Sequence, residues 1–107
     1  MNEKLLKVST AFSPTPGARY YEDGDDSGQE FFDKCLKKAF SDALEIGSIL
    51  VVDLDDTEGY ATSFLDEAFV RLVKEFGKSI VKKHIRIISN EEPDWIEEIN
   101  NYIDEAE

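Results

Sequence analysis

The chain has 107 residues, which predicts a single domain over residues 1–107 with one hydrophobic core. Its 24 acidic and 12 basic residues give a net charge of −12, which argues against binding to nucleic acids or anionic membranes, since both are polyanionic. No apolar run reaches the roughly 18 residues of a membrane helix, and the charged first residues show no signal-peptide pattern. Because the single Cys35 cannot form an internal disulfide, we expect a cytoplasmic protein.

The first half of the chain predicts two strands and one long helix. Residues 4–12 (KLLKVSTAF) are expected to form a strand, and the SPTPG segment that follows predicts a turn. Residues 18–21 (ARYY) are expected to form a short second strand that closes a hairpin onto the first. Residues 27–47 have apolar residues at i, i+3, i+4 and i+7, which predicts an amphipathic helix. Ser27 and Glu30 form a capping box at its start, and Gly47 is typical of a helix end.

The second half predicts a strand, a helix, a strand and a helix. Residues 48–54 (SILVVDL) form a continuous apolar run, which is typical of a strand buried on both faces. A helix is expected over residues 63–76, a strand over residues 84–89, and a last helix from Pro93. The element order β-β-α-β-α-β-α predicts an α/β sandwich with a four-stranded mixed sheet and three helices, in which the later strands are parallel.

The stretch ILVVDLDDTEGY raises a catalytic alternative at the end of the apolar strand. Asp53, Asp55 and Thr57 are similar to the first motif of the haloacid dehalogenase phosphatases, in which the first aspartate is the nucleophile and the second is an acid/base. Ser89 and Asn90 are similar to that family's second motif. The Mg²⁺-dependent reaction also needs a lysine at the phosphoryl group and a later acidic pair, but no basic residue follows Asn90. We therefore keep this phosphatase only as the alternative.

The stretch DGDDSG is similar to the beginning of an EF-hand calcium loop. Asp23, Asp25, Ser27 and Gly28 match positions 1, 3, 5 and 6, but Lys34 stands where the loop needs a bidentate glutamate. The simpler interpretation is that Ser27 caps the following helix and that the aspartates lie favourably near the positive end of its dipole. We expect no metal ion and no other cofactor.

The stretch ATSFLDEAF, residues 61–69, predicts the start of the second long helix. Thr62 or Ser63 is expected to cap the helix, with Asp66 or Glu67 reaching back to the first turn. A hydroxyl at a helix start is also a place where a phosphate is stabilised by free amides and the helix dipole.

Several segments in this order give the chain its resemblance to a known family. The chain resembles the STAS domain, the fold of anti-sigma factor antagonists, and more specifically the bacterial STAS-like family of domains of unknown function. The residues that carry this resemblance are Gly17-Ala18-Arg19-Tyr20, Asp23-Gly24, Ser27-Gly28-Gln29-Glu30-Phe31, Val52-Asp53-Leu54 and Thr62-Ser63-Phe64-Leu65-Asp66-Glu67-Ala68-Phe69.

The resemblance implies a non-catalytic regulatory module that works by protein–protein interaction. In anti-sigma factor antagonists, a kinase of the GHKL ATPase type phosphorylates a serine at the start of this helix and so changes the affinity for a partner. The family's Asp-Ser-Ser-Gly falls on residues 61–64, which makes Ser63 and Thr62 the candidate phospho-acceptors. A GHKL-type ATPase or kinase is the expected partner. The expected partner-binding surface consists of Asp55, Asp56, Thr57, Glu58, Tyr60, Phe64 and Glu67.

Overall fold

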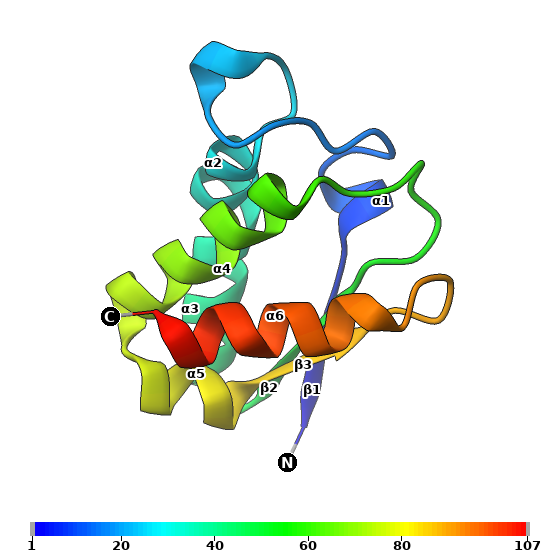
Figure 1. Cartoon of the computed structure of the whole chain (residues 1–107). Helices are drawn as coiled ribbons and strands as arrows, with labels where there is room; N and C mark the ends of the chain where they lie inside the picture. Colours follow the sequence, from blue (N-terminus) through cyan, green and yellow to red (C-terminus); the bar gives the residue numbers. More distant parts are fainter. Residues whose placement is uncertain (1, 107) are drawn as a thin grey trace.

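A computed structural model describes residues 2–106, and Figure 1 shows its helices and strands. The elements in chain order are β1 (Glu3–Lys7), α1 (Val8–Ala11), the 3-10 turn η1 (Tyr21–Asp23), α2 (Gly28–Phe31), the π-helical turn η2 (Phe32–Leu36), α3 (Lys37–Glu45), β2 (Ile49–Asp53), α4 (Thr62–Phe76), α5 (Lys78–His84), β3 (Ile85–Ile88) and α6 (Asp94–Glu105).

The sheet has three parallel strands in the order β1-β2-β3, so the predicted four-stranded mixed sheet is wrong. Lys7 lies opposite Asp53, and Asp53 lies opposite Ile88, so the three strands end at the same edge. The predicted parallel pairing of the later strands is confirmed. The predicted first strand is too long, because β1 stops where its partner β2 stops and the chain turns into α1.

The predicted strand over residues 18–21 is absent because its backbone serves the start of α2 instead. The amide of Gly28 donates to the carbonyl of Ala18 at 2.8 Å, and that of Gln29 donates to Arg19 at 2.9 Å. The first amides of a helix have no acceptor within the helix, and these carbonyls supply one. The apolar and aromatic residues of ARYY therefore lie in an irregular segment beside a helix end, not in a hairpin.

The long helix predicted over residues 27–47 is observed as the continuous run α2, η2 and α3. The Ser27 hydroxyl accepts from the Glu30 amide at 3.1 Å, which confirms the cap, while the Glu30 carboxylate pairs with Lys34 rather than reaching back. Gly47 follows the helix at φ +65°, and the amides of Gly47 and Ser48 bond to carbonyls of the last turn, as in a Schellman motif.

The helices after β2 differ from the prediction by one element. Helix α4 runs as expected and ends at Gly77, which has φ +95°. A second helix, α5, then follows at once and was not predicted, so residues 2–106 contain five α-helices in addition to the short α1, where three helices were predicted. Within residues 2–106, the longest apolar stretches of helix fall short of what is needed to cross a bilayer.

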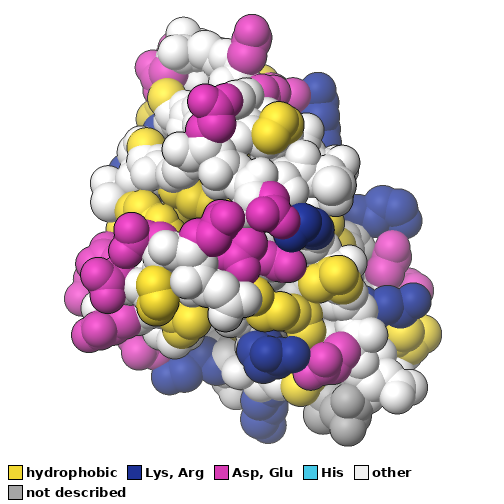
Figure 2. Space-filling model, turned by 90° about the vertical axis from the view of Figure 1, so that its right-hand side faces the viewer, with side chains coloured by type: hydrophobic (Ala, Val, Ile, Leu, Met, Phe, Trp, Pro, Cys, Tyr) yellow, Lys and Arg dark blue, Asp and Glu magenta, His cyan; other side chains and the backbone are white. Residues whose placement is uncertain are grey.

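The hydrophobic core lies on one face of the sheet. Leu6, Leu50, Val52 and Ile87 alternate with residues of the opposite face and belong to one buried cluster with side chains from α2 to α6. The strand order 1-2-3 explains this, because two right-handed crossovers in the same direction place their helices on the same side. The other face, with Leu5, is outside this cluster. The domain is therefore a two-layer α/β structure with a partly open sheet face. On the side of the molecule seen in Figure 2, apolar, basic and acidic side chains lie next to one another.

Candidate functional site

The carboxyl edge of the sheet gathers charged side chains from all three strand ends. The Lys7 ammonium lies 3.3 Å from Asp53 Oδ2 and 2.8 Å from Asp56 Oδ2. Its hydrogen bond with Asp56, followed by that with Asp53, raises the pKa of Lys7. In parallel α/β folds this edge is the usual place for binding sites. Lys7 was not predicted as a site residue, because the expected strand over residues 4–12 placed it in mid-strand rather than at this edge.

Two loops at this edge are tied together by Asp55. Its carboxylate accepts from the Glu91 amide at 2.9 Å and from Asn90 Nδ2 at 3.0 Å. In return, Glu91 Oε1 accepts from the Asp56 amide at 2.7 Å. The bond from the Glu91 amide is the main reason why the pKa of Asp55 lies below its ordinary value. The loop after β2 is thus held against the loop after β3.

Asp55 should contribute to stability in a pH-dependent way. Because its folded-state pKa is lowered, the contribution is present above about pH 4 and is lost as the pH falls through the folded-state pKa. We expect Asp55→Asn to lower the melting temperature at pH 7 by a few degrees and to have a progressively smaller effect as the pH falls below about 4. Thermal scans followed by circular dichroism measure this, with Asp25→Asn on an exposed loop as the control. A pH-independent deficit would contradict the role of the charge.

The two loops enclose a hollow of about 200 Å³. Tyr60 and Trp95 line it with their rings nearly perpendicular, at 79° and 6.4 Å between centroids. The Tyr60 hydroxyl donates to the Leu54 carbonyl at 2.9 Å, and burial raises the pKa of this phenol. The remaining lining residues are mostly polar or acidic and are Leu54, Asp55, Thr57, Glu58, Gly59, Ser89, Glu91 and Glu92. Trp95 was not predicted as a site residue.

The start of α4 differs from the predicted cap. Ala61 is the N-cap, and no side chain caps this helix, so neither Thr62 nor Ser63 has the predicted capping role. Thr62 is exposed and Ser63 is half-buried. Asp66 does not reach back to the first turn but binds Arg19 Nη1 at 2.7 Å. This ion pair connects the irregular segment before α2 to α4.

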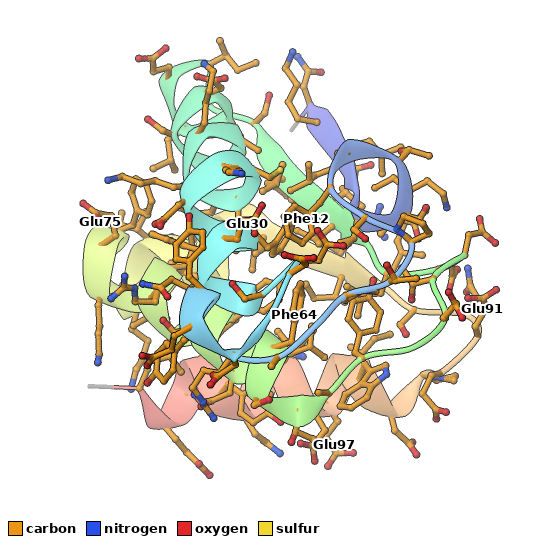
Figure 3. All side chains as sticks on the ribbon, turned by 90° about the horizontal axis from the view of Figure 1, so that it is seen from above. Phe12, Glu30, Phe64, Glu75, Glu91 and Glu97 are labelled. Carbon is orange, nitrogen blue, oxygen red and sulfur yellow. The ribbon has the colours of Figure 1, made fainter. Side chains whose placement is uncertain are left out.

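Two residues of the predicted partner-binding surface are buried. Phe64 is 0% exposed and lies in the interior between α2 and α4 (Figure 3), so its place on the surface is a wrong prediction. Glu67 is 8% exposed, and its carboxylate faces Arg71 at 3.5 Å and Arg19 at 3.9 Å. The other members, from Asp55 to Tyr60, lie together on the loop that leads to Thr62.

The acidic loop before α2 is organised by its own contacts. Asp26 accepts from the Ser13 hydroxyl at 2.8 Å, and Asp23 accepts from the Tyr20 amide at 3.2 Å. Among the described residues 2–106, no three His, Cys, Asp or Glu side chains converge as a metal site requires. Cys35 donates to the Ala11 carbonyl, and burial raises the pKa of its thiol, so the nucleophilic thiolate is disfavoured.

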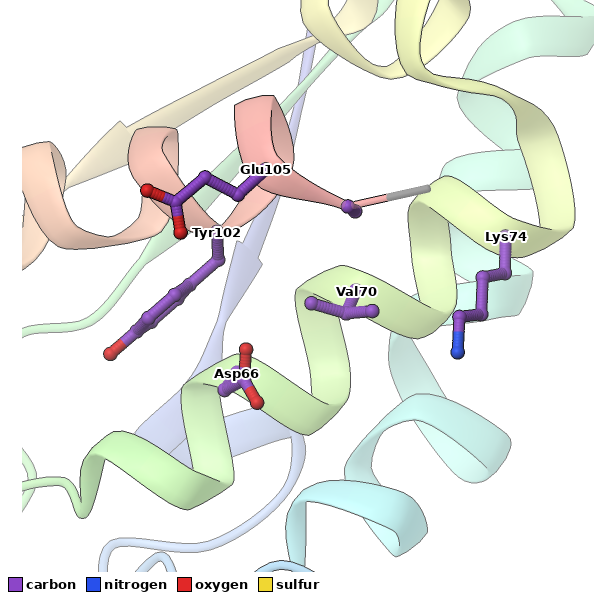
Figure 4. Close-up of a pocket in the computed structure, with 6 residues that line it drawn as sticks. Asp66, Val70, Lys74, Tyr102 and Glu105 are labelled. Atoms are coloured by element: carbon purple, nitrogen blue, oxygen red, sulfur yellow. The ribbon is translucent and has the colours of Figure 1, made fainter.

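A second hollow of about 350 Å³ lies between α4 and α6 (Figure 4). Asp66, Val70 and Lys74 line it from α4, and Tyr102 points across it from α6. Burial and a 2.9 Å hydrogen bond to Glu98 raise the pKa of Tyr102 to about 12. Tyr102 is therefore a neutral hydrogen-bond donor at neutral pH, and its bond to Glu98 lies within α6.

The fold and the site together define a small α/β domain with two acidic loops at the carboxyl edge of a parallel sheet. Residues 27–95 match the family model of the STAS-like domain of unknown function (DUF4325), so the chain belongs to this family. The predicted resemblance is thereby confirmed, and the match covers the helix run from Ser27, the loop after β2, the start of α4 and the loop that ends at Trp95. Neither a curated protein nor a solved structure matches the chain.

Proposed function

We propose that the chain is a non-catalytic regulatory module that binds a protein partner through the loop of residues 54–60 and the start of α4. The observation that carries this proposal is the fixed loop itself. Asp55, Lys7 and Glu91 hold its backbone and side chains in place, while Asp56 and Glu58 remain exposed beside a hollow lined by Tyr60. A rigid, charged loop beside an aromatic hollow suits recognition, because little conformational entropy is lost on binding.

The charge of this surface favours a partner with basic side chains. Asp55, Glu58, Glu91 and Glu92 surround the hollow, and the whole chain carries −12. A lysine or arginine of the partner could place its charge among these carboxylates and its stem against the Trp95 ring. We propose that this partner is an ATPase or kinase of the GHKL type.

Phosphorylation at the start of α4 would provide the switch. Thr62 and Ser63 occupy the first turn of a 15-residue helix that no side chain caps. A phosphate attached there would lie close to the free amides and the positive end of the helix dipole. It would also add about two negative charges beside the proposed recognition loop, and a partner that reads this loop by charge would respond to the change.

The test uses this chain, ATP and a candidate GHKL-type ATPase. Intact-mass spectrometry should detect one added phosphoryl group, which should disappear in Ser63→Ala or Thr62→Ala and persist in the control Ser79→Ala.

In calorimetry, Glu58→Lys should weaken binding of the same ATPase at least tenfold, about 1.4 kcal/mol, whereas Glu45→Lys on the exposed end of α3 should not. Binding that Glu58→Lys leaves intact would overturn the proposed surface.

One observation favours the alternative, a Mg²⁺-dependent phosphatase. Lys7 lies beside Asp53, where the sequence offered no lysine. However, Asp53 Oδ2 accepts from Lys7, and Asp53 Oδ1 accepts from the Asp55 amide at 2.9 Å, so both oxygens of this nucleophile candidate already hold the strand end and its loop. Hydrolysis of p-nitrophenyl phosphate with Mg²⁺ that is lost in Asp53→Asn would establish the phosphatase and refute the non-catalytic module.

A further inference from the structure

Strand β1 presents an unpaired backbone edge. It pairs with β2 on one side only, and within residues 2–106 it is the terminal strand of the sheet, at the rim of the molecule (Figures 1 and 3). The Ile49 amide donates to the Asn2 carbonyl at 2.8 Å, so the backbone groups of even-numbered residues point toward β2. The backbone amides and carbonyls of Glu3, Leu5 and Lys7 consequently point away from β2, toward the outside of the sheet. Such an edge is a template for a further strand.

The side chain at the middle of this edge is apolar and exposed. Leu5 is 66% exposed, more than the other large exposed apolar side chains, and it lies on the sheet face opposite the core cluster. Its neighbour in the register is Val51, which is 3% exposed and outside the main core cluster. Val51 is therefore already covered, and an added strand would bury Leu5. Burial of apolar surface thus favours occupancy of the edge, in addition to backbone hydrogen bonds.

The sequence of β1, EKLLK, is complementary to itself in one antiparallel register. When two copies are centred on Leu5, each Glu3 lies opposite the Lys7 of the other copy, and the two Leu5 residues lie opposite each other. The same register matches the outward backbone groups, because residues 3, 5 and 7 then form the hydrogen-bonded pairs. A register centred on Lys4 would instead place two lysines opposite each other. It would also pair the backbone groups of even-numbered residues, which point toward β2 and not toward the second copy.

The local charge of the edge also suits a second copy. Two copies of a chain with net charge −12 repel each other, but β1 itself carries two lysines and one glutamate. The acidic α6 follows β3, which is the strand at the opposite edge of the sheet from β1. Glu3 already has an ion pair with Arg86 at 3.1 Å, and Lys7 has ion pairs with Asp53 and Asp56, so both charges that meet across the two copies are already partly neutralised. Electrostatic repulsion between two copies is therefore small at the β1 edge.

We propose that two copies of the chain pair through the outer edges of β1, antiparallel and related by a two-fold axis at Leu5, to form a continuous six-stranded sheet. The two Leu5 residues exchange two backbone hydrogen bonds, and the Lys7 amide of each copy donates to the Glu3 carbonyl of the other. Antiparallel pairing places the two carboxyl edges at opposite ends of the dimer. If the proposed recognition loop is correct, the dimer is a bivalent module whose two partners do not collide.

Site-specific cross-linking tests this register. In a Cys35→Ser background, Leu5→Cys places the two Cα atoms about 5.5 Å apart, within the range of a disulfide. The control Glu3→Cys, on the same exposed strand, places them about 13 Å apart, which is too far. With copper–phenanthroline as oxidant, the Leu5→Cys dimer should form at least about tenfold faster than the Glu3→Cys dimer. Equal rates would overturn the proposed register.

Sedimentation equilibrium tests the association without cross-links. The unmodified chain should show a mass that rises toward that of a dimer with concentration, and Leu5→Lys should raise the dissociation constant at least tenfold, because two charges then meet at the axis. Ile46→Lys, at a 58% exposed apolar residue after α3, is the control and should leave the association unchanged. A chain that remains monomeric would refute the dimer. Glu58→Lys should dimerise normally, which separates this proposal from that of the recognition loop.

Discussion

Replacing Phe64 by alanine should lower the free energy of unfolding by about 3–5 kcal/mol, the range for large aromatic side chains removed from a protein core. Phe64 is 0% exposed, and its ring stacks on Phe31 at 5.6 Å between centroids. It also contacts Tyr60 at 5.8 Å and Phe12 at 6.2 Å. The truncation would leave a cavity where α2, α4 and the loop of residues 54–60 meet. The three remaining rings cannot fill this cavity unless those elements move.

Urea unfolding followed by circular dichroism measures this loss. Phe64→Leu keeps most of the volume and should cost well under half as much, so a folded variant remains available even if the alanine variant unfolds. Ile80→Ala, at a residue 40% exposed on α5, serves as the surface control and should also cost far less. The opposite result, unchanged stability together with lost partner binding, would place Phe64 at the surface as the sequence resemblance implied.

Phe64 shows how the resemblance and the residue pattern can disagree. The family motif assigns this position to a phospho-acceptor loop, and that assignment placed Phe64 among the partner-binding residues. Helical periodicity assigns it differently, because Phe64 lies four residues before Ala68 and eight before Leu72, both fully buried. The buried position that helical periodicity indicates for Phe64 is the one observed. A helix places residues i and i+4 on one face whatever the function of its first turn.

The parts of the fold that could be predicted are those with a strong local signal. The apolar run of β2 and the stripes of α4 and α6 each form the expected element. Helix α5 was missed because Val81 is its only fully buried residue, so it has no apolar stripe. The segment at Arg19 was assigned to a strand because nothing local reveals that its carbonyls accept from α2. Such contacts depend on where two segments meet in three dimensions.

The site was predicted in part for the same reason. Asp55 and Tyr60 lie on a single loop after a recognisable strand, so the sequence places them together. Lys7, Asn90 and Trp95 join them from elsewhere in the chain, and their approach depends on strand order and register. If the end of β1 had been predicted at Lys7, Lys7 would have been expected beside Asp53, since parallel strands end at one edge.

Gly28→Ala should lower the free energy of unfolding by about 2–3 kcal/mol, although helix propensity alone predicts the opposite sign. Gly28 is buried in α2, where alanine is ordinarily favoured by nearly 1 kcal/mol. Here a Cβ would lie 2.4 Å from the Phe64 carbonyl oxygen and 3.0 Å from two further backbone atoms of Phe64. Because the obstacle is backbone rather than a flexible side chain, α2 and α4 must separate to admit the methyl group.

Gly47→Ala is the matched control for this effect. Gly47 has φ +65° with open space around its Cβ position, so alanine there should cost about 1–2 kcal/mol through backbone strain alone. Chemical denaturation of both variants compares the stability lost through the close approach of α2 and α4 with that lost through backbone strain. A Gly28→Ala variant more stable than the unmodified chain would show that α2 and α4 are not in the close contact described. Separation of the two helices would also displace the first turn of α4, so Gly28→Ala should weaken partner binding at Ser63 and the recognition loop from a residue that the partner does not touch.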